Sequence, residues 1–473
     1  MKVCLLDTDT GRQASARSPT YDLRAPREGW SEQDPETWLD ALAAAAEGLG
    51  GAQGAGPGVD AVCLTGQMHG AVVVGAAGRA LRPAILWPDL RAGAEVCRLA
   101  DAFGAETLRS WTGSAPSANH VLPKLLWMQA HESGTLRQAS RFLLPKDWVR
   151  ARLGGAPVTE PTDGSGTGLM DLGSLAWRPE LLAVLGPAAR LAPEIVPSAS
   201  VVGRLSSEWA RRLGVRAGSP LLAGAGDLPA AVLASGARGA AQPVFHIGSA
   251  AQVAVVRGPE ALGRRGAQAF CHPDPGWRIG CGTLLAAGLA VRWARERLGG
   301  VELPPPAQVP RLLFVPHLAG ERGPVADLAS RGAWVGLGLE TGAADMAAAA
   351  AYGVVLALRE ALDRLSGGSA GPADPRVLAE GPFARDWVER LAHGLGRPVR
   401  LVPHLSPSAL GACWIAAVAI GAATWDDLMS RVAAGLPVPP DPEAARRLEA
   451  LYAAYGDLRG PLGAAAAALD AAP

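Results

Sequence analysis

The sequence carries no excess charge of either sign. Its 473 residues include 44 Lys and Arg against 44 Asp and Glu. A surface without a net field does not draw nucleic acid or an anionic membrane toward it by long-range attraction. We therefore expect a small-molecule partner, and neither nucleic acid nor a membrane.

Cysteine is scarce, and the cysteines are not spaced as metal ligands are. The sequence has six cysteines and no Cys-x-x-Cys pair. Scattered cysteines are typical of buried thiols in a reducing compartment, so we predict no disulfide and no structural zinc. The six are Cys4, Cys63, Cys97, Cys271, Cys281 and Cys413.

Long hydrophobic runs are missing as well. The first apolar run ends at Leu6 and is followed by Asp7 and Asp9, and the alanine-rich stretches elsewhere are interrupted by Arg, Asp or Glu. Such runs are too short for a signal peptide or a membrane span. They predict a cytoplasmic protein.

The sequence does contain apolar runs that alternate with helical patterns in both halves. Its length exceeds one ordinary core, which favours two domains of roughly 200 to 250 residues each. We predict an α/β protein with two similar domains, residues 1–238 and 239–473, and a cleft between them.

Asp227 is the main candidate for chemistry. It lies in a glycine-rich turn after the apolar run that starts at Leu221, and a second run from Val244 breaks at Gly248 and Ser249. A carboxylate at a strand end beside a tight turn suits phosphoryl transfer, in which Asp takes the proton of an attacking hydroxyl and backbone amides hold phosphate oxygens. Gly-Asp turns also occur at the ends of buried strands, so the residues alone leave a purely structural turn as the commoner alternative.

Two polar clusters are candidates for a small-molecule pocket. Gln67, Met68 and His69 lie between two apolar runs, with flanking glycines that allow the backbone to approach a ligand. Trp87 and Asp89 place an aromatic ring near a carboxylate, a grouping that can stack on and hydrogen-bond a polyol. The alternatives are a core histidine in the first cluster and, in the second, a tryptophan at a domain edge beside a surface Asp–Arg pair.

Three further glycine-containing stretches differ in their surroundings. Residues 162–168 lack the Lys-Ser/Thr ending of a P-loop, so we interpret them as a structural turn. Residues 7–11 (DTDTG) follow a predicted strand at 2–6 and are interpreted as a hairpin turn, with a phosphate loop as the rival interpretation. Residues 377–384 (VLAEGPFA) predict a strand, a Gly-Pro turn and a helix, and a turn at that end of a strand favours a nucleotide base or ribose.

Short motifs follow one another along nearly the whole chain. They are GWSEQDPETW at 29–38, LTGQMHG at 64–70, ILWPDLR at 85–91, LPKLLW at 122–127, LPKD at 144–147, SGT at 165–167, AGER at 319–322, RGAWVGL at 331–337 and DMAAAA at 345–350. In kind and in order they resemble the FGGY family of carbohydrate kinases, most closely its xylulokinase branch.

The resemblance implies two actin-like (ribonuclease H-like) domains that close over a cleft. Sugar is expected on the first domain, and ATP with Mg²⁺ on the second. Asp227 matches the family's general base and is expected to lie near the Mg²⁺-ATP complex. The implied sugar-binding residues are Gln67, Met68, His69, Trp87 and Asp89, and the implied ATP-binding residues are Gly248, Ser249, Gly282, Thr283, Gly381 and Phe383.

Departures from the family pattern leave the sugar open. Leu228 and Pro229 follow Asp227, whereas xylulokinases usually have Asn at the position directly after this Asp. The sequence Gly-Asp-Leu is more similar to that of sedoheptulokinases. The adenosine turn reads EGPF at 380–383 instead of Gly-Gly-Gly, and Tyr352 stands where an acidic residue is usual.

The start of the sequence departs further. Family members open with a strand and an Asp-x-Gly-Thr-Ser/Thr loop, followed by a second strand and an Asp-x-x-Gly turn. Residues 1–7 are similar to that second strand and residues 9–11 to its turn, so we expect the first strand and loop to be missing. An unpaired sheet edge and little kinase activity are then expected of this form.

The leading hypothesis is an ATP-dependent kinase that phosphorylates the terminal hydroxyl of a ketose, with D-xylulose to xylulose 5-phosphate first and sedoheptulose second. Mg²⁺ would offset the phosphate charge. The alternative from a different class is a family member that binds sugar without turnover. A homodimer is left open.

Overall fold

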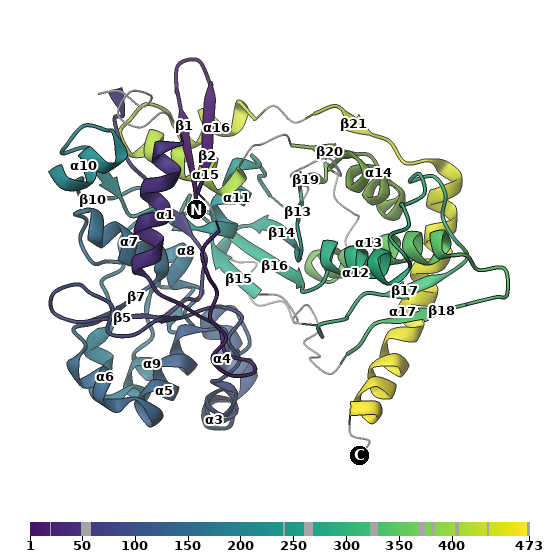
Figure 1. The fold of residues 1–473 in the computed structure, drawn as a ribbon, viewed down its shortest axis with the longest axis horizontal. Helices are drawn as coiled ribbons and strands as arrows, with labels where there is room; N and C mark the ends of the chain where they lie inside the picture. Colours follow the sequence, from purple (N-terminus) through teal and green to yellow (C-terminus); the bar gives the residue numbers. More distant parts are fainter. Residues whose placement is uncertain are drawn as a thin grey trace.

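The computed structural model places two α/β halves side by side (Figure 1), which confirms the predicted fold class. It describes the chain except for residues 19, 49–57, 240–241, 260–267, 322–329, 368–373, 380–383, 403–405, 433–434 and 471–473, and the side chains of Arg459 and Asp470.

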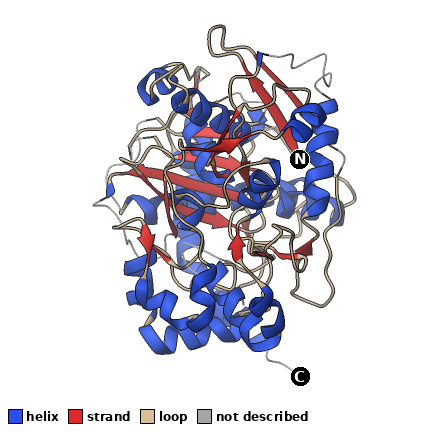
Figure 2. Cartoon of the chain, turned by 90° about the vertical axis from the view of Figure 1, so that its left-hand side faces the viewer, coloured by secondary structure: helices blue, strands red, loops and turns tan. Residues whose placement is uncertain are grey.

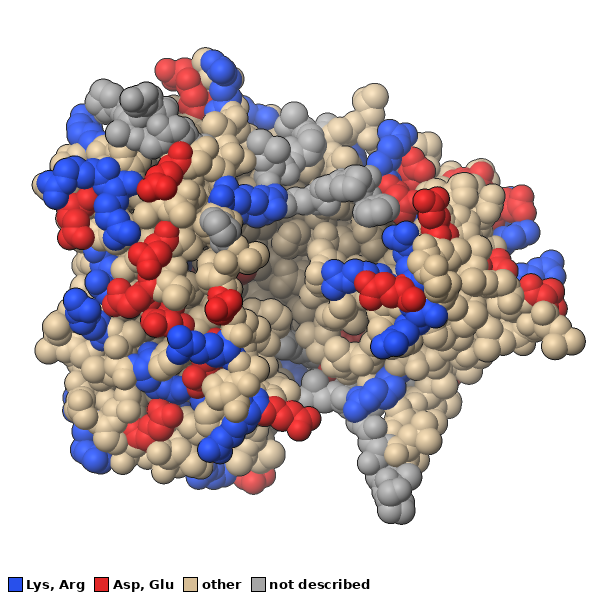
Figure 3. Space-filling model, in the orientation of Figure 1, with Lys and Arg blue, Asp and Glu red and all other residues tan. Residues whose placement is uncertain are grey.

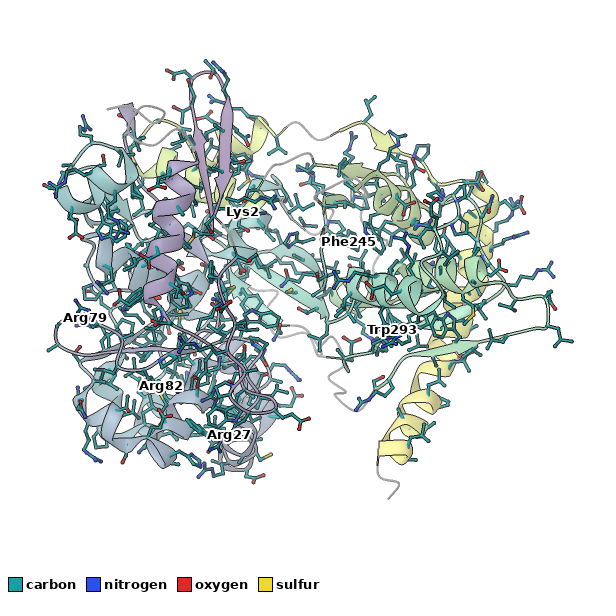
Figure 4. The ribbon with its side chains drawn as sticks, viewed as in Figure 1. Lys2, Arg27, Arg79, Arg82, Phe245 and Trp293 are labelled. Carbon is teal, nitrogen blue, oxygen red and sulfur yellow. The ribbon has the colours of Figure 1, made fainter. Side chains whose placement is uncertain are left out.

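A mixed sheet forms the centre of the second half. In the described part of the chain its strand order is β15-β16-β14-β13-β19-β20-β21, with β13, β19 and β20 parallel and the other neighbouring strands antiparallel. Phe245, labelled in Figure 4, is fully buried on β13. The strands are β13 (Val244–Ile247), β14 (Ala251–Arg257), β15 (Gln268–Cys271), β16 (Arg278–Leu284), β19 (Arg376–Ala379), β20 (Val399–Leu401) and β21 (Pro437–Val438).

The alanine-rich helix α13 packs closely on this sheet and on β17. Small side chains allow the approach, and Gly353 has no room for a larger one, because an added Cβ would lie 2.2 Å from the Phe314 carbonyl oxygen. Tyr352, the departure noted in the sequence, is buried and donates its hydroxyl to the Pro306 carbonyl. The remaining elements here are α12 (Gly288–Arg297), β17 (Leu313–Val315), β18 (Ala333–Val335), α13 (Ala343–Ser366), α14 (Ala384–Leu395) and α17 (Pro442–Asp470).

The first half contains short paired strands among helices. Its strands are β3 (Glu32–Gln33), β4 (Thr65–Gly66), β5 (Val72–Val74), β6 (Ala84–Ile85), β7 (Arg141–Leu143), β8 (Met170–Asp171), β9 (Ala176–Trp177), β10 (Val201–Arg204), β11 (Pro220–Leu222) and β12 (Ala225–Gly226). Its helices are α1 (Glu36–Glu47), α3 (Gly93–Phe103), α4 (Ala105–Thr112), α5 (Val121–His131), α6 (Ser133–Gln138), α7 (Pro145–Leu153), α8 (Pro161–Gly164), α9 (Pro179–Val184), the 3-10 helix η2 (Gly186–Leu191), α10 (Ser207–Leu213) and α11 (Asp227–Ala234).

One expected strand is largely absent. The apolar run 59–64 predicts a buried strand, but in it only Val62 forms a bridge, to Leu221, before β4 pairs with β12. The prediction is wrong over most of this run, because a β-strand needs backbone partners along its length and only Val62 pairs in this way.

The predicted N-terminal hairpin is confirmed. Strands β1 (Lys2–Leu6) and β2 (Gln13–Arg17) pair antiparallel in register and stand beside helices in Figure 2. The carboxylate of Asp7 accepts hydrogen bonds from the amides of Asp9 and Thr10 and closes the turn. Asp7 and Asp9 are solvent-exposed, so this turn is not built as a phosphate loop.

Helix α15 (Pro407–Ala419) runs back from the second half to the first, where it packs on α11 and β1, and α16 (Trp425–Ser430) follows it (Figure 1). The contact between α11 and α15 is close, because a Cβ at Gly411 would lie 2.0 Å from the Ala230 carbonyl oxygen. Residues 407–419 therefore lie with the first half, although the predicted division at 238/239 assigns them to the second. That division stays a prediction.

Candidate active site

Asp227 is the first residue of α11 and directly follows β12. Its Oδ1 accepts a hydrogen bond of 2.8 Å from the Leu228 amide. Burial raises the pKa of Asp227 to about 6, while this hydrogen bond acts in the opposite direction. A carboxylate with such a pKa is ionised at neutral pH and remains basic enough to accept a proton from a reacting hydroxyl.

A buried hydrogen-bond chain fixes the turn that carries Asp227. The amide of Gly226 donates to Thr162 Oγ1 at 2.8 Å, and the same hydroxyl donates to Glu160 Oε1 at 2.8 Å. Glu160 also accepts from the Thr162 amide and the Ser198 hydroxyl. The stretch from Thr162, interpreted above as a structural turn, therefore holds the backbone next to the candidate base.

Met68 and His69 lie against the same turn. An added Cβ on Gly226 would lie 2.6 Å from Met68 Cγ, so glycine is needed for this approach. His69 has φ of 66° and is held by its Nδ1, 2.7 Å from the Gly166 carbonyl oxygen, and by Lys124 Nζ, 2.6 Å from the His69 carbonyl oxygen. His69 is half-buried, so its ring is not enclosed in a core.

Asp89 has a structural role in the Trp87 loop. It is fully buried, and its oxygens accept from the Ser31 amide at 2.6 Å and from the Arg91 guanidinium at 2.7 and 2.9 Å. Trp87 is 37% exposed, and Gln67 donates to Gln33 Oε1 at 3.3 Å. The structure therefore leaves Trp87 open to solvent and engages Asp89 elsewhere, and sugar contacts by these residues stay predictions.

Gly248 and Ser249 form the exposed turn between β13 and β14. The Gly248 carbonyl accepts from the Gly288 amide, and the Ser249 carbonyl accepts from the Leu289 amide, both at 3.0 Å. Helix α12 thus begins against this turn. The Gly248 amide donates to the Ala250 carbonyl at 2.9 Å, so it and the first amides of α12 are engaged within the turn. Phosphate binding by these amides stays a prediction.

The register of the sheet shows where the other predicted nucleotide-binding residues lie. Thr283 lies opposite Gln252 on the strand next to the turn, and Gly282 precedes it on β16. Ile247 is in register with Ala379 in the parallel pair β13–β19, so both strands end at the sheet edge that carries the turn. Gly381 and Phe383 lie outside the described residues.

The sugar-site candidate Met68 belongs to an apolar cluster that joins the two halves of the molecule. Met68 and Leu228 pack together with Val244 of β13 and Phe270 of β15. The ring of His69 lies 5.8 Å from that of Phe270, centroid to centroid. Figure 3 shows the surface hollowed between the two halves.

A buried charge cluster behind this turn has no counterpart in the predicted site. Lys146 Nζ lies 2.6 Å from Asp147, 3.1 Å from Asp163 and 3.2 Å from Glu160. Burial alone would lower the pKa of Lys146, but the three carboxylates outweigh it and raise that pKa. In the sequence, the motifs at 144–147 and 165–167 indicated this region, but no function was assigned to their residues.

The described residues include no group of three or more His, Cys, Asp or Glu side chains arranged to hold a metal ion. In the described part of the chain no helix is both long and apolar enough to cross a membrane.

Comparisons with known proteins place the fold and site in one family. Residues 1–234 match the model described as "FGGY family of carbohydrate kinases, N-terminal domain", and residues 264–420 match its C-terminal domain. The chain belongs to the FGGY family of carbohydrate kinases, and it is a carbohydrate kinase similar to xylulose kinases.

Curated relatives and a crystal structure give the degree of similarity. The xylulose kinase of Escherichia coli (strain K12) is 31% identical over 431 residues, which cover 89% of this chain and 88% of that protein. The xylulose kinase of Streptomyces coelicolor is 33% identical over 431 residues, covering 90% and 86%. A crystal structure described as a "xyloylose kinase" from Brucella ovis superposes with a TM-score of 0.88 at 27% identity, covering 98% of this chain and 97% of that one. Kinases of this family use ATP.

Proposed function

We propose that this kinase transfers the γ-phosphoryl group of ATP to the terminal hydroxyl of a ketose, with D-xylulose as the first candidate. The observation that carries the proposal is the Asp227 carboxylate, whose pKa burial raises to about 6. Its neighbours Gly226 and Leu228 pack against Met68, and Leu228 shares an apolar cluster with Val244 of β13. The names of the relatives support xylulose in particular.

In the proposed reaction, Asp227 accepts the proton of the sugar hydroxyl while the hydroxyl oxygen attacks the γ-phosphorus. The bond from that phosphorus to the β-phosphate oxygen breaks, and ADP leaves. Met68 and His69 orient the sugar, with Gln67 and Trp87 beside them, and Asp89 holds the Trp87 loop through its bonds to Arg91.

The nucleotide is assigned to the carboxyl ends of β13 and β19. Gly248 and Ser249 are proposed to contact phosphate oxygens, which requires the Gly248 amide to leave the Ala250 carbonyl, with Gly282 and Thr283 on the neighbouring strand. Gly381 and Phe383 are proposed for adenosine from the sequence alone.

Mg²⁺ fits this arrangement only as a partner of the nucleotide. It is usually held by one or two carboxylates together with phosphate oxygens, and the described side chains form no all-protein metal cage. Asp227 is the candidate carboxylate. When bound, Mg²⁺ neutralises phosphate charge.

A ketose panel tests the proposal. The purified chain is incubated with ATP and Mg²⁺ and with xylulose, ribulose, fructose or sedoheptulose in turn, and ADP release is measured. We expect ADP release that depends on the ketose, is slow, in line with the little activity expected above, and is fastest with xylulose. Asp227→Asn should release ADP at least ~100-fold more slowly than the parent. A chain whose thermal unfolding responds to a ketose, but which releases no ADP with any of them, would instead be a sugar-binding member without turnover.

Sedoheptulose is the second candidate because of one side chain. Leu228 is buried beside Met68 and offers no hydrogen bond to a sugar hydroxyl. A pocket with an apolar residue there accommodates different chain lengths, so the heptulose arm of the panel is informative.

A further inference from the structure

Two cysteines that are 409 residues apart in the sequence lie together where β1 packs on α15 (Figure 1). The Sγ atom of Cys413 lies 3.7 Å from the Cys4 carbonyl oxygen, and the Sγ atom of Cys4 lies 3.7 Å from the Leu5 carbonyl oxygen. The two thiols also form a hydrogen bond with each other. Both are free and partly exposed, so a small reagent in solution reaches them.

The backbone of β1 explains this contact. The Asp7 amide donates to Arg12 and the Ser18 amide donates to Met1, which fixes the residues of β1 that face β2. Because backbone groups alternate along a strand, the Cys4 carbonyl points to the opposite edge, where it accepts the Cys413 thiol. Thiols that already touch can form a disulfide without a large backbone movement.

The two thiols differ in acidity. The hydrogen bond from the Cys413 thiol lowers the pKa of Cys4, and burial opposes this effect only in part. The same hydrogen bond and burial raise the pKa of Cys413 well above its ordinary value. The thiolate therefore forms at Cys4, and Cys413 keeps its proton. A thiolate beside a second thiol is typical of cysteines that react reversibly with peroxides.

The remaining cysteines have other surroundings. Burial raises the pKa of each of Cys63, Cys271 and Cys281 to about 12, so these thiols stay protonated and react slowly. Cys63 is near enough for its charge to act on Cys413, which makes it the rival partner for a bond. Cys97 is exposed on α3 and serves as a reference thiol.

We propose that Cys4 and Cys413 form an oxidative modification site, at which a small hydroperoxide converts the two thiols into a reversible disulfide between β1 and α15. Cys4 releases its proton to solvent, and its sulfur attacks one peroxide oxygen. The O–O bond breaks, Cys4 becomes a sulfenic acid, and the other oxygen takes up a proton and leaves as water or an alcohol.

The second step closes the bond. The Cys413 sulfur attacks the Cys4 sulfur, the S–O bond breaks, and the hydroxyl group leaves as water with the proton of Cys413. Two electrons have then passed from the two sulfurs to the peroxide. A small thiol such as dithiothreitol reverses the reaction through a mixed disulfide.

The bond would tie the N-terminal hairpin to the helix pair that carries the candidate base, because α15 packs on α11 and α11 begins at Asp227. Hydrogen exchange in residues 2–6 should therefore be slower in the oxidised chain than in the reduced chain. Unchanged exchange in a chain that carries the bond would overturn this consequence.

The test uses the complete 473-residue chain and hydrogen peroxide as the probe. The chain is reduced, freed of reductant and treated with a small excess of peroxide, once folded and once in denaturant. The remaining thiols are blocked with iodoacetamide. Peptides are then mapped by mass spectrometry without reduction, and Cys97 is the internal control.

We expect a Cys4–Cys413 bond as the main cross-link of the folded chain, formed at least ~10-fold faster than Cys97 is oxidised and removed by dithiothreitol. In denaturant the pairing should be mixed. A main cross-link to Cys63, oxidation of Cys4 to sulfinic acid without the bond, or an equal yield from the folded and denatured chains overturns the proposal.

Two variants separate the roles of the thiols. In Cys413→Ser the hydroxyl still donates to Cys4 but cannot close the bond, so trapping of the Cys4 sulfenic acid by dimedone should rise at least ~10-fold over the parent. In Cys4→Ser the other thiol should stay reduced under the same treatment, because it keeps its proton. Cys97→Ser is the matched control and should cross-link like the parent.

A folded Cys413→Ser without a dimedone adduct at Cys4, or a Cys4→Ser chain in which Cys413 is oxidised at the parent rate, overturns the assignment of Cys4 as the attacking thiol. The mapping of the parent chain stands even where a variant does not fold. None of these readouts depends on kinase activity.

Discussion

Asp227 depends on neighbours that the sequence does not place beside it. The Gly226 amide is held by Thr162, and Met68 packs where a Cβ on Gly226 would lie. These contacts fix the start of α11 and bury the carboxylate enough to raise its pKa to about 6. At the residue scale, Gly-Asp turns are common in sequences, and it is the surroundings of this turn that make the Asp227 carboxylate a candidate base.

Replacing Asp227 with Asn should lower kcat at least ~100-fold, because loss of a general base typically costs 10²- to 10⁴-fold. Ketose binding, followed by the shift in unfolding temperature, should remain. For the parent, kcat/KM should rise with pH and reach half its plateau near pH 6, since the carboxylate must be ionised to accept a proton. Near-normal turnover by the variant would exclude Asp227 as the base.

Thr162 is proposed as a positioning residue. Thr162→Val keeps the shape and removes the hydroxyl that bridges Gly226 and Glu160, so we expect kcat to fall about 10-fold with little change in KM for ATP. Thr162→Ser retains the hydroxyl and should restore kcat. A purely structural role would be indicated if both variants lost stability and neither changed kcat.

Leu228 should affect the choice of sugar. Leu228→Asn adds hydrogen-bonding groups beside Asp227, and a hydrogen bond to one sugar hydroxyl is worth roughly 1 kcal/mol, or about 5-fold in kcat/KM. We expect the variant to separate ketoses more sharply than the parent does. Steady-state kinetics on the ketose panel measures this, and a parent already strict for one pentulose would contradict it.

At the scale of elements, the contact between α11 and α15 ties the C-terminal part of the chain to the candidate base. Gly411 allows it, since α15 approaches the Ala230 carbonyl too closely for any side chain. Residues from the middle and from the last quarter of the sequence thus share one helix pair.

Gly411→Ala should lower the free energy of unfolding by about 1 to 3 kcal/mol, because the new Cβ has no space. Gly456→Ala is the matched control. Gly456 is an exposed glycine in α17 with nothing within 4 Å of an added Cβ, and alanine there should stabilise the helix by roughly 0.5 to 1 kcal/mol. Chemical denaturation of both variants checks the pair, and equal effects would show that the helix contact is looser than described.

At the scale of the whole molecule, the candidate base carries a cost in stability. The pKa of Asp227 is raised in the folded chain, so folding favours its protonated form. That contribution is complete below about pH 4 and is lost as the pH rises through about 6. At neutral pH the folded chain holds a partly buried charge.

Asp227→Asn should therefore be more stable than the parent at pH 7.5 by about 2 kcal/mol, since one pKa unit corresponds to about 1.4 kcal/mol and part of the charge still reaches solvent. The difference should shrink toward pH 4, where both side chains are neutral. Unfolding free energies of both proteins across this range give the answer. A gap that does not change with pH would mean that the charge of Asp227 costs nothing.

The sequence by itself determined the family and the α/β class. The hairpin turn at 7–11 and the strand before the EGPF turn follow from local signals, namely turn residues and short apolar runs. Ordered motifs added the kinase chemistry and the candidate base.

Only the tertiary structure decided which of these residues are engaged and with what. Asp89 accepts a hydrogen bond from Ser31, Gly226 donates one to Thr162, and Lys146 forms an ion pair with Glu160. These contacts join segments that are separated along the chain. The incomplete strand at 59–64 could not be predicted either, because an apolar run forms a strand only where backbone partners lie along its edges. Local pattern fixes what a segment can form, and long-range hydrogen bonds and packing fix what it does form.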